Sequence, residues 1–247
     1  MSIRSQSEFE KLRVIGRIVR RVLDTAAAAV RPGITTGELD EIAGRVLSAS
    51  GAVSAPPKVY GFPGHLCISV NDEAIHGIPG SREIRGRDLV KLDLVAEKDG
   101  FFADAAVTIC VGEPDDTARR LVRCAESAFH QATRVARAGN RVYEIGRAVE
   151  RETRRCGFQV IRSLCGHGVG RTIHEEPSVP NYHEPRARTR LTEGLVITIE
   201  PIISAGSGEG VLDRDQWTIR TADGSLSAHY EHTVVITSRE PILLTAA

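Results

Sequence analysis

The sequence predicts an α+β fold built from a duplicated unit whose two halves share one sheet. Two observations predict it. Two pairs of helical segments are each followed by segments typical of strands, and one constant shift along the chain aligns Gly33 with Gly139. No low-complexity segment separates the halves. We therefore expect a single domain over residues 1–247, with an internal repeat at roughly 8–112 and 115–242.

The first half is predicted to begin with two helices. Apolar residues at helical spacing, after a capping-box pattern that begins at Ser7, predict a first helix from there to about Val30. A second helix is expected to be capped by Thr35 or Thr36 and to end at Gly51. Strands should then follow, because the next apolar runs are short and alternate with polar residues.

The second half repeats this order of elements. We expect one helix from Asp115 to Gly139 and another from Asn140 to Gly157. The β-branched run that ends at Glu200 is then the counterpart of a strand in the first half. This repetition of two helices followed by strands is what makes a duplicated unit the simplest interpretation.

Composition and charge exclude several classes of function. Lys and Arg number 32, and so do Asp and Glu, so no overall charge favours binding to DNA or to an anionic membrane. The five cysteines are odd in number and form no C-x-x-C pair, which is typical of reduced thiols in the cytoplasm. The sequence also lacks the apolar segments of a signal peptide or a membrane span. We expect a cytoplasmic protein.

Two aspartates stand in an otherwise apolar hairpin. Asp93 and Asp104 lie in its two strands, where Asp is uncommon and a buried, unpaired carboxylate is costly. A turn centred before Asp99 would place them directly opposite, and a turn at Asp99-Gly100 would make them diagonal neighbours on one face. Carboxylates so placed repel unless they share a proton or a cation. The alternative is that one of them caps the turn or faces solvent.

Three further residues can join the two aspartates. His167 lies between glycines, Glu200 ends a β-branched run, and Glu231 opens another strand. Taken singly, a turn histidine and solvated glutamates would explain them. Together, four carboxylates and one imidazole suit divalent ions such as Mn, Fe(II), Co or Zn. Four carboxylates can hold two ions, which can activate a water and stabilise a hydrolytic transition state.

Five ordered segments carry a resemblance to a known family. They are "YGFPGHLCISVNDEAIHGIPG" (60–80), "LVKLDLVAEKDGFFADAAVTICVG" (89–112), "CGHGVGRTIHEEPSV" (165–179), "EGLVITIEPI" (193–202) and "SLSAHYEHTVVIT" (225–237). The chain resembles type I methionine aminopeptidases from about Ser7 to Ile242. The resemblance implies their pita-bread fold, a pseudo-two-fold α+β arrangement with a central curved, mainly antiparallel sheet that helices cover on one side.

The resemblance also implies a dinuclear metal site. Its ligands would be Asp93, Asp104, His167, Glu200 and Glu231. By the family pattern Asp93 binds one ion bidentately, His167 and Glu200 belong to the other, and Asp104 and Glu231 bridge. Glu200 would also be the general base. The two divalent ions could be Co, Mn, Fe(II) or Zn, and the residues leave their identity open.

Two further histidines are implied to act on the substrate. His76 would contact it near the scissile bond, and His174 would donate to the scissile amide or to the developing oxyanion. Without the motif, each would be interpreted as a structural histidine. His229 and His232 flank Glu231 and are expected to point to the opposite face of that strand.

A methionine pocket completes the implied site. The family pattern forms it from Phe62, Cys67, Ile173 and Trp217, and polarizable or aromatic walls suit a thioether. Trp217 could equally be a core residue. The chain departs from the common pattern at Ala103-Asp104-Ala105, where many members have Gly-Asp-Thr, and at Ile75 and Ile173. These departures concern the surroundings of Asp104 and the shape of the pocket.

The resemblance implies removal of the initiator methionine from nascent polypeptides with a small second residue. One alternative is a proline-specific aminopeptidase or prolidase, which shares the fold and the ligands. Another is a non-catalytic binding scaffold, against which the presence of every ligand argues. The Arg-rich first helix allows a transient ribosome contact, although a solvated helix face is the better expectation. We expect a monomer.

Overall fold

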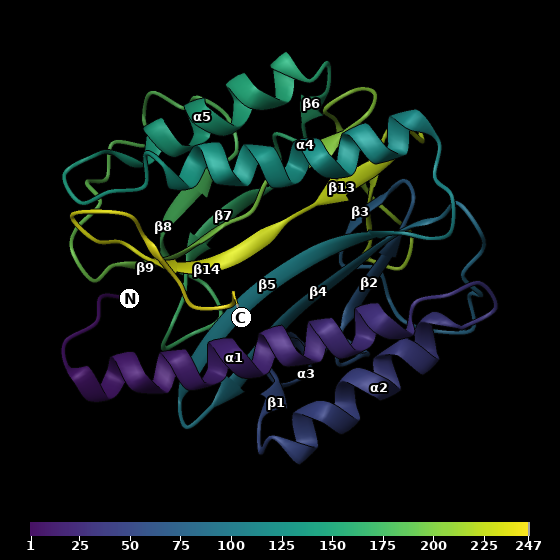
Figure 1. Cartoon of the computed structure of the whole chain (residues 1–247), viewed down its shortest axis with the longest axis horizontal. Helices are drawn as coiled ribbons and strands as arrows, with labels where there is room; N and C mark the ends of the chain where they lie inside the picture. The colour runs from purple at the N-terminus through teal and green to yellow at the C-terminus, as the bar shows by residue number, and fades with distance from the viewer. Residues whose placement is uncertain (247) are drawn as a thin grey trace.

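The computed structural model describes residues 1–246 and places helices against one face of a central sheet (Figure 1). The helices are α1 (Gln6–Ala29), α2 (Thr36–Ala49), α3 (Ala55–Tyr60), α4 (Asp116–Thr133) and α5 (Val142–Arg155). The strands are β1 (Val53–Ser54), β2 (Cys67–Val70), β3 (Glu73–Ile75), β4 (Leu89–Lys98), β5 (Phe101–Cys110), β6 (Gln159–Val160), β7 (Cys165–Gly168), β8 (Glu175–Pro180), β9 (Val196–Ile199), β10 (Ile202–Ser204), β11 (Gly210–Leu212), β12 (Ile219–Thr221), β13 (Ser227–His229), β14 (Glu231–Val235) and β15 (Ile242–Leu243).

The main sheet has nine strands and is antiparallel throughout. Its central path runs β1-β4-β5-β14-β9-β7-β8, with β2 paired to β4 and β15 paired to β14. Two three-stranded sheets, β13-β10-β6 and β11-β12-β3, complete the described strands. This arrangement confirms the predicted α+β fold with a mainly antiparallel sheet, whereas the internal repeat stays a prediction.

Two helix pairs cover the sheet on the same side. Figure 1 shows α1 and α2 below α4 and α5, with β5 and β14 passing between the pairs. Helix α1 packs on β4 and β5, and α4 contacts β5, β9 and β13. Because successive strand residues point to opposite faces, Leu92 and Leu94 enter the core under α1 while Asp93 points to the other face. The face without these helices is therefore the one that carries the acids.

The helix ends show which sequence signals were decisive. The first N-cap is Ser5, whose hydroxyl accepts from the amide of Glu8, so the predicted cap at Ser7 is wrong. Each serine has a glutamate three residues later, and the two patterns overlap. Thr35 caps α2 in a capping box with Glu38, as predicted.

No helix within residues 1–246 combines the length and apolar character needed to cross a membrane.

The acidic hairpin turns at Asp99-Gly100. Both turn residues have positive φ, 53° and 79°, which matches a two-residue hairpin turn. In this register Asp93 pairs with Ala106 and Asp104 pairs with Val95. The two aspartates are thus diagonal neighbours on one face, the second of the two arrangements that the sequence allowed.

Candidate active site

One cavity of about 240 Å³ opens on the face of the sheet opposite the two helix pairs, with the end of α3 at its wall. All eleven residues singled out in the sequence line it. They are Phe62, Cys67, His76, Asp93, Asp104, His167, Ile173, His174, Glu200, Trp217 and Glu231. Neighbouring strands of one sheet bring these distant segments together.

Four carboxylates form the floor of the cavity, and each comes from a different strand or strand end. Asp93 lies on β4, Asp104 on β5 and Glu231 at the start of β14, while Glu200 directly follows β9. Ala106 pairs with both Asp93 and Glu231, so a methyl group separates these two acids across the sheet. The small residue leaves room for carboxylates from both sides.

His167 meets this floor from β7. Its Nε2 lies 3.6 Å from Asp104 Oδ2 and 3.7 Å from Glu200 Oε1. Thr198 links the two strands, since its hydroxyl accepts from the His167 amide at 2.9 Å and donates to Glu200 Oε1 at 2.6 Å. The backbone of His167 and the carboxylate of Glu200 are therefore held by one shared side chain.

The neighbouring carbonyl of Gly168 determines which ring nitrogen of His167 is the hydrogen-bond donor and which is the acceptor. Nδ1 lies 2.9 Å from the carbonyl oxygen of Gly168, which can only accept a hydrogen bond, so Nδ1 carries the proton. Burial lowers the pKa of His167 to about 4, so the ring is neutral near pH 7. The lone pair on Nε2 thus faces the acids, which is the arrangement of a metal-binding histidine whose other nitrogen bonds a carbonyl.

The acids are buried without compensation from basic side chains. Burial raises the pKa of each of the four, and repulsion by neighbouring acids adds to this for Asp104, Glu200 and Glu231. Asp104 Oδ1 and Glu231 Oε1 have no hydrogen-bond partner within the described residues. Among the described residues 1–246, no Lys or Arg lines the cavity. The site therefore gathers four carboxyl groups whose ionised forms nothing in its walls stabilises.

This donor set fits divalent metal ions. One ligand atom from each of Asp104, His167 and Glu231 lies within 4.8 Å of the others. Asp93 and Glu200 contact the same group, since the Asp93 carboxyl interacts with that of Asp104 and the Glu200 carboxyl with that of Glu231. Oxygen ligands with one imidazole suit hard or borderline cations, and Asp104 and Glu231 each keep a buried oxygen without a hydrogen-bond partner.

The two predicted substrate histidines lie at the wall of the cavity. His76 has a φ of 58°, a conformation that costs energy for a residue with a Cβ and is common at functional sites. His174 stacks edge-on against His167, with ring centroids 4.2 Å apart. Its Nδ1 lies 2.6 Å from the hydroxyl of Tyr60. Burial lowers the pKa of both His76 and His174, so neither carries a charge near neutral pH.

The other end of the cavity is apolar. Phe62 and Trp217 meet edge to face with ring centroids 5.3 Å apart, and Cys67 and Ile173 close the space beside them. The carboxylate of Asp215 accepts from the backbone amide of Trp217 and fixes the backbone at this residue. Burial raises the pKa of Cys67, which keeps its thiol protonated and apolar rather than nucleophilic.

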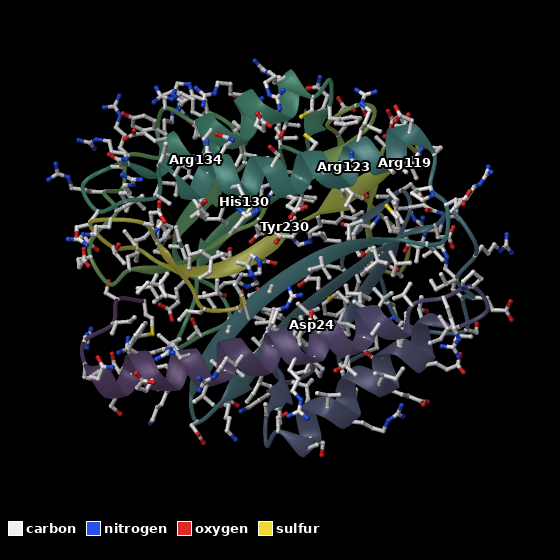
Figure 2. All side chains as sticks on the ribbon, in the orientation of Figure 1. Asp24, Arg119, Arg123, His130, Arg134 and Tyr230 are labelled. Atoms are coloured by element: carbon white, nitrogen blue, oxygen red, sulfur yellow. The ribbon has the colours of Figure 1, made fainter. Side chains whose placement is uncertain are left out.

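His229 contradicts the sequence analysis. It lines the cavity, and its Nε2 lies 3.5 Å from Glu231 Oε2, whereas we expected it on the opposite face. It stands two positions before Glu231, so the two-residue period of an extended chain places both side chains on one face. Tyr230 and His232 do lie on the helix side, where both pack against Phe129 of α4, and Figure 2 shows Tyr230 beside His130 of that helix.

The backbone of Asp104 is held from the neighbouring strand. Thr233 accepts from the Asp104 amide at 2.9 Å and donates to its carbonyl oxygen at 2.8 Å. Ala105, where many family members have Thr, pairs with His232 and joins the core on the helix side. The departure at Ala103-Asp104-Ala105 thus leaves the backbone of Asp104 tied to β14, which the sequence did not reveal.

Comparisons with known proteins agree with this geometry. The model of metallopeptidase family M24 matches residues 10–238. "Methionine aminopeptidase 2" of Bacillus subtilis is 44% identical over 247 residues, 99% of each chain. The crystal structure of a methionine aminopeptidase from Thermotoga maritima superposes with a TM-score of 0.97 at 34% identity, over 100% of both chains.

A prolidase from Pyrococcus furiosus shares the fold. Its TM-score is 0.80 at 24% identity, and the match covers 99% of this chain and 65% of the prolidase. The predicted resemblance is confirmed, because the family model spans nearly the whole sequence and the relatives align from end to end. The chain belongs to metallopeptidase family M24.

Proposed function

We propose that this protein is a methionine aminopeptidase that removes the initiator methionine from nascent polypeptides. One observation carries the proposal, namely a single cavity that joins a floor of four carboxylates and a histidine to an apolar end. An unbranched thioether side chain suits the apolar end, whose walls are aromatic, aliphatic and sulfur-containing. The scissile bond would then lie over the acids.

Five residues would hold two divalent metal ions, and these are Asp93, Asp104, His167, Glu200 and Glu231. When bound, the ions supply Lewis-acid chemistry, which acidifies a water and polarises a carbonyl group. The orphaned oxygens of Asp104 and Glu231 and the free lone pair of His167 support this ligand set. The two metal ions would be Co, Mn, Fe(II) or Zn.

The remaining polar residues would handle protons and the substrate. Glu200, oriented by Thr198, would take a proton at its carboxylate as general base. His174 would donate a hydrogen bond to the scissile amide or to the developing oxyanion. His76 would contact the substrate close to that bond. Each of these side chains lines the cavity, so one bound peptide could reach all three.

The finer parts of the proposal concern the substrate and its location. We infer a preference for a small second residue, as the resemblance implies, and action on nascent chains in the cytoplasm. All five cysteines are free thiols, which fits a reducing compartment. The Arg-rich face of α1 is solvent-exposed at several positions and leaves room for a transient ribosome contact.

The test offers two peptides to the purified, metal-loaded protein. We expect release of methionine from Met-Ala-Ser and no cleavage of Ala-Pro-Ala, with Mn, Co, Fe(II) or Zn added in parallel. Cleavage of Ala-Pro-Ala alone would replace the proposal with a proline-specific peptidase. Absence of cleavage of either peptide by protein shown to contain two ions would indicate a binding scaffold. A Met-Leu-Ser peptide, cleaved more slowly than Met-Ala-Ser, would support the preference for a small second residue.

A further inference from the structure

Two neighbouring histidines in the cavity have different partners at Nδ1, and this difference assigns a role to Tyr60. We propose that Tyr60 is a positioning residue that fixes His174 in the tautomer with its proton on Nε2, so that Nε2 can donate to the substrate. The inference rests on the proposed function, in which His174 is that donor. It concerns a side chain that the sequence analysis did not single out.

Tyr60 is placed by the end of a short helix. It is the last residue of α3, and Gly61 after it has a φ of 76°, a left-handed conformation that favours glycine. The amides of Gly61 and Phe62 donate to the carbonyl oxygens of Pro57 and Pro56, which fixes the turn. The phenol lies at the cavity while 48% of the residue stays exposed, so substrate and solvent can both reach this edge.

The contact between Tyr60 and His174 is short and direct. The phenol oxygen lies 2.6 Å from His174 Nδ1, and the ring centroids are 5.8 Å apart. Burial raises the pKa of Tyr60, so the phenol keeps its proton and can donate it. When it donates to Nδ1, that nitrogen carries a lone pair and the proton of the neutral ring must be on Nε2.

The backbone of His174 is held at the same place. The hydroxyl of Thr172 donates to the His174 carbonyl oxygen at 2.9 Å. The ring of His167 also packs against the imidazole of His174, at an interplanar angle of 70°. Tyr60 therefore supplies the hydrogen bond that selects the tautomer, while Thr172 and His167 restrict the position of the ring.

His167 shows why the partner at Nδ1 matters. A carbonyl oxygen beside its Nδ1 requires a proton there and leaves Nε2 as an acceptor that faces the acids. If His174 had such a partner, its Nε2 would also be an acceptor and could not donate to a carbonyl oxygen. A hydroxyl can serve as donor, and this gives the second histidine the opposite tautomer. The two rings can thus perform opposite tasks although their centroids are only 4.2 Å apart.

The first test reads the tautomer without using activity. The ring nitrogens of His174 are observed by ¹⁵N NMR in the zinc-loaded protein, which is diamagnetic, and a His174→Ala variant assigns them by loss of the signals. We expect Nδ1 to be unprotonated and hydrogen-bonded in the wild type, and its resonance to shift in Tyr60→Phe as the hydrogen bond is lost. A proton on Nδ1 in the wild type, or identical His174 signals in Tyr60→Phe, would overturn the proposal.

The second test measures the consequence for catalysis with Met-Ala-Ser. We expect Tyr60→Phe to lower kcat about 3- to 10-fold at unchanged KM, the range of one neutral hydrogen bond. In a His174→Ala background the same substitution should cause no further loss. Equal losses in both backgrounds would show that Tyr60 acts independently of His174 and would overturn the proposal.

A matched control is Tyr143→Phe. Tyr143 also packs against a histidine, His183, with ring centroids 5.7 Å apart, but no hydrogen bond joins the pair within the described structure. The control should leave the His174 signals and kcat unchanged. If the wild type releases no methionine from Met-Ala-Ser, the proposed function fails, and the NMR experiment still decides whether Tyr60 fixes the tautomer.

Discussion

Among the regions of this protein that bury carboxylates, two treat them in opposite ways. At the interface of α4 and α5, Glu152 is 7% exposed and accepts from Arg155 Nε and Nη2 at 2.8 and 2.7 Å and from Ser127 Oγ at 2.6 Å. These hydrogen bonds lower its pKa to about 2. In the cavity, burial raises the pKa of every acid on the floor, and orphaned carboxylate oxygens remain there.

The presence or absence of basic partners distinguishes a structural carboxylate such as Glu152 from the carboxylates of the candidate site. Glu152 has partners for its charge, so its burial is compatible with stability. The acids of the cavity floor have mainly other acids as neighbours. Burial of such a group of carboxylates is unfavourable unless a further partner compensates for their charge. Membership of a metallopeptidase family and the cluster of candidate ligands indicate that bound metal provides the compensation. Substitutions in the two regions should therefore have opposite effects on stability and on activity.

The largest expected effect is that of Asp104→Asn. Loss of a ligand charge should lower kcat/KM for Met-Ala-Ser by more than about 100-fold. Mutation of residues that only hydrogen-bond to metal ligands already lowers activity or metal affinity by up to about 100-fold. The metal-free variant should unfold at the same temperature as the metal-free wild type or higher, because a buried carboxyl whose ionised form is disfavoured is replaced by a neutral amide. The exposed carboxylate of Asp24 provides the control, since Asp24→Asn should leave activity unchanged. Full activity of Asp104→Asn would show that the site is misassigned.

Metal removal should distinguish the two regions by thermal stability. A ligand at about 100 times its Kd stabilises by about 2.7 kcal/mol, so adding metal to chelated wild type should raise Tm by about 5–10 °C. The same increase is expected for Glu152→Gln, which lies outside the site, and a much smaller one for Asp104→Asn. Calorimetry with and without chelator measures all three. An equal gain in Asp104→Asn would mean that the stabilising metal binds elsewhere.

The floor acids could be predicted from the sequence because their signal is local and unusual. Acids inside apolar strands stand out against strand propensity, and an even spacing around a tight turn is enough to place Asp93 and Asp104 on one face. The turn register itself was open, because the sequence allowed either of two centres. Positive φ at Asp99 and Gly100 settled it in favour of diagonal neighbours.

What the sequence could not provide is contact between distant segments. Tyr60 and His174 are 114 positions apart, and no periodicity connects a short helix to the loop before β8. Thr233 supports Asp104 across 129 positions for the same reason. His229 is different, since its two-residue spacing from Glu231 in the sequence already implies one shared face of an extended chain. The cap of α1 was ambiguous in principle, because two overlapping patterns compete there.

The smallest effect concerns the paired acid, Glu152→Gln. The substitution replaces a charged acceptor of hydrogen bonds by a neutral one, which should cost about 1.5–3 kcal/mol of unfolding free energy at pH 7 and leave kcat unchanged. Denaturant unfolding measures the loss. Glu126→Gln on the exposed side of α4 is the matched control and should change the unfolding free energy by less than about 0.5 kcal/mol.

The pH dependence of that loss sharpens the comparison. The pKa of Glu152 is lowered from 4.5 to about 2 in the folded protein, so the unfolded chain binds more protons between these values. Stability from this group is therefore fully present above about pH 4.5 and declines as the pH falls toward 2. The difference in unfolding free energy between wild type and Glu152→Gln should shrink over that range. A difference that stays constant from pH 7 to pH 3 would mean that Arg155 contributes through packing alone, and Glu152 would then no longer contrast with the acids of the cavity.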